Sequence, residues 1–177
     1  MADVAVLSDT HVYHDPAETV PEWVRDAVAA ADCAVHAGDF VTPTALDFFE
    51  DHARELIAVR GNADVSGVDP PEVATLSVEG VTLVVTHPPD VGDASLEPEA
   101  YREAVLSAVP ERVDPEAGPV VAIAGHTHRI IDERVGRVRL LNPGSATAAL
   151  PAERATMLRL TVEGEGVEVD VLTGGDG

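Results

Sequence analysis

The segment VVAIAGHTH, residues 120–128, joins a short apolar run to two histidines. The run 120–124 is rich in Val and Ile, which is typical of a buried strand. His126 and His128 would point to opposite faces of a regular strand. Behind Gly125, where the strand turns into a loop, we expect the chain to bend so that both imidazoles face one centre. Imidazole is a common metal ligand, so the segment indicates a candidate metal site, although the pattern alone leaves a ligand role open.

The N-terminal third alternates between apolar runs and helical periodicity. It predicts strands at 2–7, 33–36 and 56–59, a loop at 12–19, and helices at 21–30 and from Thr42-Pro43 onward. This β-α-β-α-β order favours right-handed crossovers and a parallel sheet.

The remainder of the chain predicts a second set of strands. The expected elements are strands at 72–78, 81–86 and 120–124, a helix at 99–109, a hairpin at 129–141, a tight turn at 142–145 and a last hairpin over 156–162 and 167–172. Residues from about 174 are expected to fray. No linker or repeat divides the chain, so we expect one domain over 1–177. The predicted fold class is α/β, a four-layer α/β/β/α sandwich with two mixed β-sheets.

Metal-capable side chains follow five of the predicted strands. They are Asp9, His11, Asp39, Asn62, His87, His126 and His128. Because ligands bind beyond the carboxyl ends of strands in open α/β sheets, these side chains should meet at one edge. Seven donors are too many for one ion and suit two ions that share a bridging carboxylate. Oxygen and nitrogen donors without a thiolate fit Mn²⁺, Ni²⁺, Fe or Zn²⁺ better than Mg²⁺ or Ca²⁺.

The order of these motifs resembles the calcineurin-like metallophosphoesterases. The resemblance rests on Asp9-Thr10-His11, Gly38-Asp39, Gly61-Asn62-Ala63-Asp64, His87 and Gly125-His126-Thr127-His128, and it covers about residues 3–172. The small size and the stretches 8–11 and 142–145 look like the compact YfcE-type phosphodiesterase subfamily.

The resemblance implies a binuclear centre. One ion would take Asp9, His11, Asp39 and His128, and the other would take Asp39, Asn62, His87 and His126. A hydroxide shared by the ions would attack phosphorus in line, with Asp39, Asn62 and His126 closest to the chemistry. The implied activity is that of a metal-dependent phosphoric ester hydrolase, a phosphodiesterase acting on a small diester or nucleotide-like substrate.

Two departures from the family pattern bear on the substrate. Ala63 stands where many members carry a proton-donating His, so we expect a preference for good leaving groups such as aryl esters. Pro88-Pro89 follows His87 where the subfamily usually has Gly-His. His14 could supply the missing proton or be an exposed loop residue. Arg129 could bind phosphate in a bidentate fashion or pair with surface carboxylates, and Arg60 has the same two interpretations.

Other polar residues are expected to have structural roles. Buried His36 is interpreted as hydrogen-bonded or as support for a metal ligand. His52 should cap a helix, and Asp64 should anchor the loop around Asn62. Asn142 and Ser145 are expected to shape their turn.

The composition indicates in what solvent conditions and in which cell compartment the protein works, and which partners it binds. The 177 residues carry a net charge of −21, and all eleven basic residues are arginine, which favours salt adaptation like that of halophilic archaea over an ordinary acidic protein. The single Cys33 excludes an internal disulfide. No apolar run approaches a membrane span and no signal peptide is recognisable, so we expect a cytoplasmic protein without a membrane partner. We expect no stable nucleic-acid complex, and the sequence leaves a homodimer open.

Other functions remain compatible with the fold. A phosphomonoesterase or nucleotide phosphatase is a close variant. A non-catalytic protein-binding scaffold, the role of a eukaryotic retromer subunit with this fold, should have lost ligands that this chain retains. A structural metal site fits poorly, because seven donors on open loops do not make a closed site.

We predict that folding depends on salt, because self-repulsion among 32 carboxylates is screened only at high ionic strength. Circular dichroism should show a loss of secondary structure when KCl is lowered from molar to millimolar concentration. An unchanged spectrum would favour an ordinary acidic protein.

Overall fold

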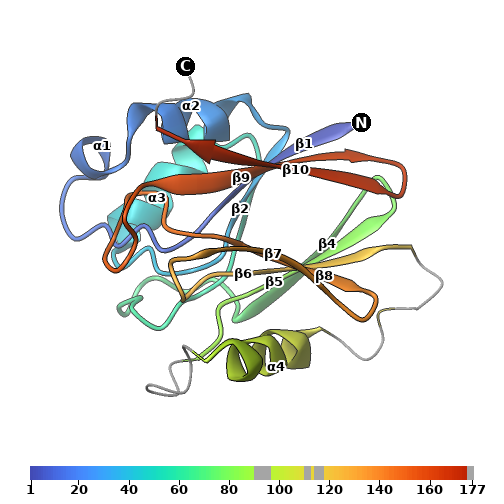
Figure 1. Cartoon of the computed structure of the whole chain (residues 1–177). Helices are drawn as coiled ribbons and strands as arrows, with labels where there is room; N and C mark the ends of the chain where they lie inside the picture. Colours follow the sequence, from blue (N-terminus) through green and yellow to red (C-terminus); the bar gives the residue numbers. More distant parts are fainter. Residues whose placement is uncertain (90–96, 110–112, 114–117, 175–177) are drawn as a thin grey trace.

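Two five-stranded mixed sheets form the centre of the molecule (Figure 1). The computed structural model describes residues 1–89, 97–109, 113 and 118–174. The first sheet contains, in spatial order, β10 (Gly166–Thr173), β9 (Thr156–Glu163), β1 (Ala2–Leu7), β2 (Cys33–His36) and β3 (Leu56–Ala58). The second contains β4 (Val73–Val78), β5 (Val81–Thr86), β6 (Val120–Ala124), β8 (Val138–Pro143) and β7 (Ile130–Val135).

Each sheet has a parallel part and antiparallel partners. β1, β2 and β3 run parallel, and β9 and β10 pair antiparallel beside them. β5, β6 and β8 run parallel between antiparallel edge strands β4 and β7. The carboxyl ends of the parallel strands therefore gather at one edge of each sheet, as the sequence pattern predicted.

The helices form the two outer layers (Figure 1). α1 (Pro16–Thr19), α2 (Glu22–Ala30) and α3 (Pro43–His52) lie against the first sheet, where Val24, Val28 and Phe49 pack in one apolar cluster with residues of β1 and β2. α4 (Pro98–Ala108) covers the second sheet through Tyr101 and Val105. The predicted α/β/β/α sandwich is confirmed. Among the described residues, no helix is both long and apolar enough to cross a membrane.

The core between the sheets is built from β-branched and leucine side chains. Strand residues such as Val6, Leu83, Ile123 and Leu160 are fully buried there. Because both faces of the central strands are covered, β2 and β6 are apolar along nearly their whole length rather than alternating. Burial of both sheets against each other fixes the relative position of the loops that leave their carboxyl ends.

Two local expectations were wrong. The segment expected as a loop at 12–19 contains α1, because the Asp15 carboxylate accepts a hydrogen bond from the N–H of Ala17 and Pro16 occupies the first helical turn. The expected tight turn at 142–145 begins later, since β8 continues through Pro143 and pairs with β7 there.

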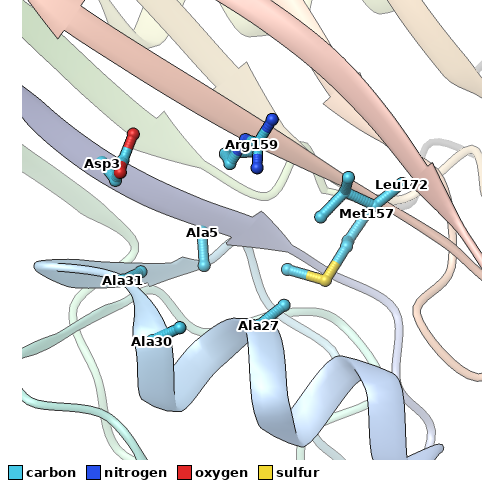
Figure 2. Close-up of a pocket in the computed structure, with 8 residues that line it drawn as sticks. All are labelled: Asp3, Ala5, Ala27, Ala30, Ala31, Met157, Arg159 and Leu172. Carbon is cyan, nitrogen blue, oxygen red and sulfur yellow. The ribbon is translucent and has the colours of Figure 1, made fainter. Parts of the chain in front are cut away.

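A small gap lies between α2 and the first sheet (Figure 2). Its volume is about 150 Å³, and alanines Ala27, Ala30 and Ala31 face β1 and β9 across it. Asp3 lines it near the start of β1, whereas Asp9 follows the end of that strand. The gap lies on the α2 side of the first sheet, and none of the seven candidate ligands lines it.

Candidate metal centre

The seven predicted side chains come together where the two sheets meet. Asp9 and His11 follow β1, Asp39 follows β2 and Asn62 follows β3, all in the first sheet. His87 follows β5 of the second sheet, and His126 and His128 follow β6. The two loop sets touch directly, because the N–H of His126 donates to the Asp9 carboxylate at 3.0 Å.

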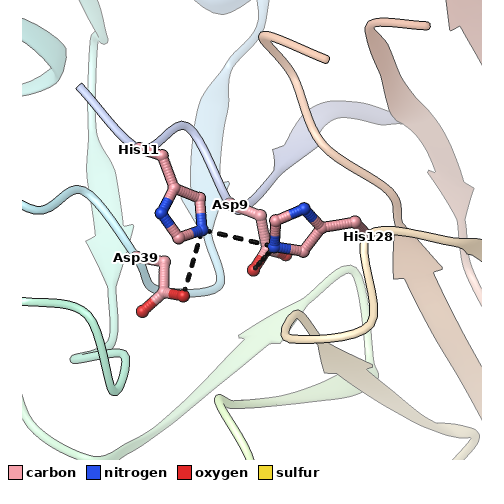
Figure 3. A group of neighbouring side chains, drawn as sticks. All are labelled: Asp9, His11, Asp39 and His128. Atoms are coloured by element: carbon pink, nitrogen blue, oxygen red, sulfur yellow. Dashed lines mark hydrogen bonds and ion pairs between the residues drawn. The ribbon is translucent and has the colours of Figure 1, made fainter. Parts of the chain in front are cut away.

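One group contains Asp9, His11, Asp39 and His128 (Figure 3). One ligand atom from each lies within 4.8 Å of the others. The Nε2 atoms of His11 and His128 are 3.2 Å apart. His11 Nε2 is 3.3 Å from Asp39 Oδ2, and His128 Nε2 is 3.3 Å from Asp9 Oδ1.

A second group contains Asn62, His87 and His126. The amide oxygen of Asn62 is 2.9 Å from His87 Nε2 and 3.0 Å from His126 Nδ1. His87 Nε2 is also 3.5 Å from Asp39 Oδ2. This group therefore meets the first one at the Asp39 carboxylate.

The two oxygens of Asp39 have different surroundings. Oδ2 faces both His11 and His87, whereas Oδ1 accepts a hydrogen bond from the N–H of Ala63 at 2.8 Å. Burial by itself raises the pKa of this carboxyl, but the hydrogen bond with His11, the electrostatic interaction with His87 and the N–H of Ala63 outweigh it and lower the pKa to about 2. Asp39 is therefore ionised, as a metal ligand must be.

A backbone carbonyl oxygen orients one histidine ring in each group. His87 Nδ1 is 2.7 Å from the carbonyl oxygen of Ala37, and His128 Nδ1 is 2.8 Å from that of Ala149. A carbonyl oxygen only accepts, so each Nδ1 carries the hydrogen and the neutral ring presents an unprotonated Nε2 to further acceptors. A hydrogen bond from Nδ1 to a carbonyl oxygen is a usual way in which a protein orients an imidazole that binds metal through Nε2.

The spacing of the donors fits divalent cations. With metal–ligand bonds of about 2.0–2.2 Å, ligand atoms at right angles lie about 2.8–3.1 Å apart and those at a tetrahedral angle about 3.3–3.6 Å apart. The separations in both groups run from 2.9 to 3.5 Å. The donor atoms of each group are thus spaced so that one cation could be coordinated by them.

Comparison with known proteins agrees with this geometry. Residues 2–165 match the calcineurin-like phosphoesterase superfamily domain. This chain belongs to the calcineurin-like phosphoesterase superfamily. The family predicted from the five motifs is therefore confirmed, and a divalent-metal centre is in keeping with it.

Relatives of this phosphoesterase include a probable metallophosphoesterase of Methanocaldococcus jannaschii, 32% identical over 160 residues that cover 90% of this chain and 76% of the relative. Two solved structures share the fold. Vacuolar Protein Sorting 29 from Cryptosporidium parvum superposes with a TM-score of 0.76 at 17% identity, covering 99% of this chain and 93% of that one. A structure described as a novel archaeal phosphodiesterase gives 0.66 at 22% identity, covering 96% and 99%.

The phosphoesterase loops turn through strained backbone at the candidate ligands. Of the eight non-glycine residues with positive φ in the described chain, five are Asp9, His11, Asp39, His126 and His128. Asp and His tolerate this conformation better than most residues, but it still costs about 1–3 kcal/mol each. The positive φ at His126 and His128, of 83° and 54°, is what turns the β6 loop sharply at these two residues.

Gly125 has a different role from the one expected. We predicted that it lets the chain bend, but its own φ is not in the left-handed region. A Cβ at this position would lie 2.6 Å from the carbonyl oxygen of Ala37, 2.8 Å from Asp9 Oδ2 and 3.0 Å from His87 Nδ1. Gly125 is therefore required because the two sheets approach closely here, and this contact could not be read from local sequence.

A buried hydrogen-bond network holds the β6 loop. The amide Nδ2 of Asn142 donates to the carbonyl oxygen of Gly125 at 3.0 Å and to Thr127 Oγ1 at 3.1 Å. The hydroxyl of Tyr101 donates to the same carbonyl at 3.0 Å. Ser145 Oγ donates to the backbone oxygen of Asp9 at 2.7 Å. Asn142 and Ser145 thus fix ligand-bearing loops in addition to their own turn, whereas no local sequence pattern indicates this role for Tyr101.

Other predicted residues take structural roles. His36 is fully buried, stacks on Phe40 with ring centroids 3.6 Å apart and has its Nε2 3.1 Å from Thr10 Oγ1, while burial lowers its pKa to about 3. Asp64 accepts hydrogen bonds from the N–H groups of Gly61 and Val41, both at 2.7 Å, so it anchors its loop as expected. His52 Nδ1 lies 2.7 Å from the carbonyl oxygen of Phe48 at the end of α3, which agrees with a capping role.

The basic residues Arg60, His14 and Arg129, each of which had two interpretations, differ in their contacts. Arg60 donates to the carbonyl oxygens of Val68 and Asp64 and pairs with Asp69, so its guanidinium is occupied structurally. His14 is exposed and makes no hydrogen bond or ion pair with any described residue. Arg129 is exposed beside His128 and forms no ion pair within the described part of the chain.

We predict that Gly125→Ala weakens divalent-metal binding at least about tenfold, because the added methyl group displaces Asp9 and His87. Isothermal titration with Mn²⁺ measures the effect, and circular dichroism checks the fold. Gly166→Ala is the matched control, since its Cβ meets only the carbonyl oxygen of Glu163, at 3.2 Å. Equal Mn²⁺ affinity in Gly125→Ala and wild type would show that the close approach is not needed.

Proposed function

We propose that this chain is a binuclear phosphodiesterase that hydrolyses a small phosphodiester or nucleotide-like substrate. The observation that carries the proposal is the position of Asp39 Oδ2, 3.3 Å from His11 Nε2 in one donor group and 3.5 Å from His87 Nε2 in the other. One carboxylate oxygen shared by two donor groups is the arrangement that a bridging ligand requires. The archaeal phosphodiesterase of the same fold supports the choice of a diester.

The donor chemistry favours Mn²⁺, with Ni²⁺, Fe and Zn²⁺ as alternatives. The first group offers two imidazole nitrogens and two carboxylates, and the second offers two imidazole nitrogens, an amide oxygen and the shared carboxylate. Such mixed nitrogen and oxygen sets suit borderline first-row metals better than Mg²⁺ or Ca²⁺.

The residues of this chain position the reaction rather than carry it out covalently. When bound, divalent ions lower the pKa of water and neutralise the charge of a phosphate group. His87 and His128 are held in their metal-binding tautomers by the carbonyl oxygens of Ala37 and Ala149. Asn62 presents its amide oxygen between His87 and His126.

The leaving group receives no help from an acid at position 63. Ala63 contributes only its backbone N–H, which donates to Asp39 Oδ1. A positioned general acid typically contributes 10²–10⁴-fold. Esters of acidic phenols, which leave without protonation, should therefore be hydrolysed much faster than alkyl esters. Comparing bis-aryl with mono-aryl phosphate separates a diesterase from a monoesterase.

We predict that Asp39→Asn lowers kcat/KM for bis(4-nitrophenyl) phosphate at least about 100-fold and reduces the metal content, because the amide cannot bridge two cations. The protein is loaded with Mn²⁺, its metal is quantified by elemental analysis, and nitrophenolate release is followed. Asp26→Asn, a change of the same kind on the exposed side of α2, is the control. Full rate and full metal content in Asp39→Asn would contradict the mechanism, and a wild type that binds metal without turnover would favour a scaffold.

We also predict that His126→Ala and His128→Ala each lose a different ion. His128 contacts Asp9 and His11, whereas His126 contacts Asn62. Electron paramagnetic resonance of Mn²⁺-loaded protein should change from the signal of a coupled pair to that of a single ion in both variants, with different line shapes. Identical spectra, or loss of both ions from either variant alone, would argue against two separate sites.

A further inference from the structure

A hollow of about 380 Å³ opens beside His128, and it shares no lining residue with the pocket that Asn62 and His87 line. Its lining includes His128, Arg129, Pro151, Glu153, Arg154 and Thr156. The volume is sufficient for one group of a small-molecule ligand. His128 belongs both to this hollow and, through Nε2, to the metal-binding group.

The position of the hollow is fixed relative to the candidate metals. Nδ1 of His128 is hydrogen-bonded to the carbonyl oxygen of Ala149, just before the segment that carries Arg154. The N–H of Ala149 donates to Ser145 Oγ at 2.8 Å, and Ser145 Oγ donates to the backbone oxygen of Asp9. Both walls of the hollow are therefore tied to loops that carry candidate ligands.

Two arginines, Arg129 and Arg154, line the same hollow of this very acidic protein. The chain has eleven basic side chains against 32 acidic ones. Ion pairs engage five arginines of the described chain: Arg54, Arg60, Arg102, Arg139 and Arg159. Within the same described residues, neither Arg129 nor Arg154 has a carboxylate within 4.0 Å, although Glu153 lines the same hollow. The hollow thus carries a local net positive charge beside the metal-binding group.

We propose that Arg129 and Arg154 form an anion subsite for a second phosphate on the substrate. The inference rests on the proposed phosphodiesterase function and names its substrate class: a diester in which one ester arm carries an additional phosphate. An arginine fork binds phosphate oxygens through two parallel hydrogen bonds, and a net charge of −21 would otherwise repel the more anionic ester. Preference for that ester therefore requires a local cationic site.

The test uses two substrates with the same scissile bond. One is the 4-nitrophenyl ester of thymidine 5′-phosphate, and the other carries an additional 3′-phosphate. We expect wild-type protein loaded with Mn²⁺ to prefer the 3′-phosphorylated ester about tenfold in kcat/KM. In the double variant Arg129→Ala/Arg154→Ala this ratio should fall to one or below. Arg137→Ala is the matched control, because Arg137 is also exposed, also lacks an ion pair within the described residues and lies in the β7–β8 turn.

A binding measurement separates this inference from the proposed function. Isothermal titration compares thymidine 3′,5′-bisphosphate with thymidine 5′-phosphate, in wild type and in both variants. Tighter binding of the bisphosphate that disappears only in the double variant supports the subsite. Equal substrate and binding ratios in wild type and double variant overturn the subsite while leaving the phosphodiesterase intact. Hydrolysis of neither ester by metal-loaded wild type overturns the proposed function, and the binding ratio then decides the subsite alone.

Discussion

The approach of acceptor atoms from two sheets toward Asp39 is the constraint on which the candidate centre depends. His11 reaches Asp39 Oδ2 from the first sheet, and His87 reaches the same oxygen from the second. Both donor groups combine residues of both sheets, because His128 joins Asp9 and His11 while His87 and His126 join Asn62. Cations bound here would hold together the open edge of the sandwich, whereas the apolar core holds its interior.

The close approach of the two sheets comes with unfavourable backbone conformations at the candidate ligands. Five candidate ligands adopt positive φ, and histidine rings of both groups lie close to other polar ligand atoms. Backbone and side-chain hydrogen bonds around the site hold these loops in place and offset that cost. The N–H of Asp9 donates to the carbonyl oxygen of Gly38 and that of His11 to Asp39, so the β1–β2 ladder continues beyond the strands. Asn142, Tyr101 and Ser145 fix the opposite loop from buried positions. Strain concentrated at a well-supported site is typical of functional centres.

Charge is distributed unevenly around this centre. The protein as a whole is strongly acidic, and half of its described arginines are engaged in ion pairs with surface carboxylates. The hollow beside His128 brings together two arginines, Arg129 and Arg154, that form no ion pair with any described residue. With one carboxylate, Glu153, beside two arginines, this region carries a local positive charge that would attract an anionic group on an otherwise acidic surface.

The sequence by itself determined the fold class, most element positions and the seven candidate ligands. It could do so because strand periodicity is local, and because parallel strands bring the residues after their carboxyl ends to one edge whatever the details of packing. The tertiary structure alone decided which donors meet, which Asp39 oxygen is shared, why Gly125 has no side chain and that Tyr101 supports the β6 loop. It also separated Arg60, which is committed to backbone carbonyls, from Arg129, which is not. These features depend on distances between loops of different sheets, and such distances are set by how the two sheets pack rather than by any neighbouring residues in the chain.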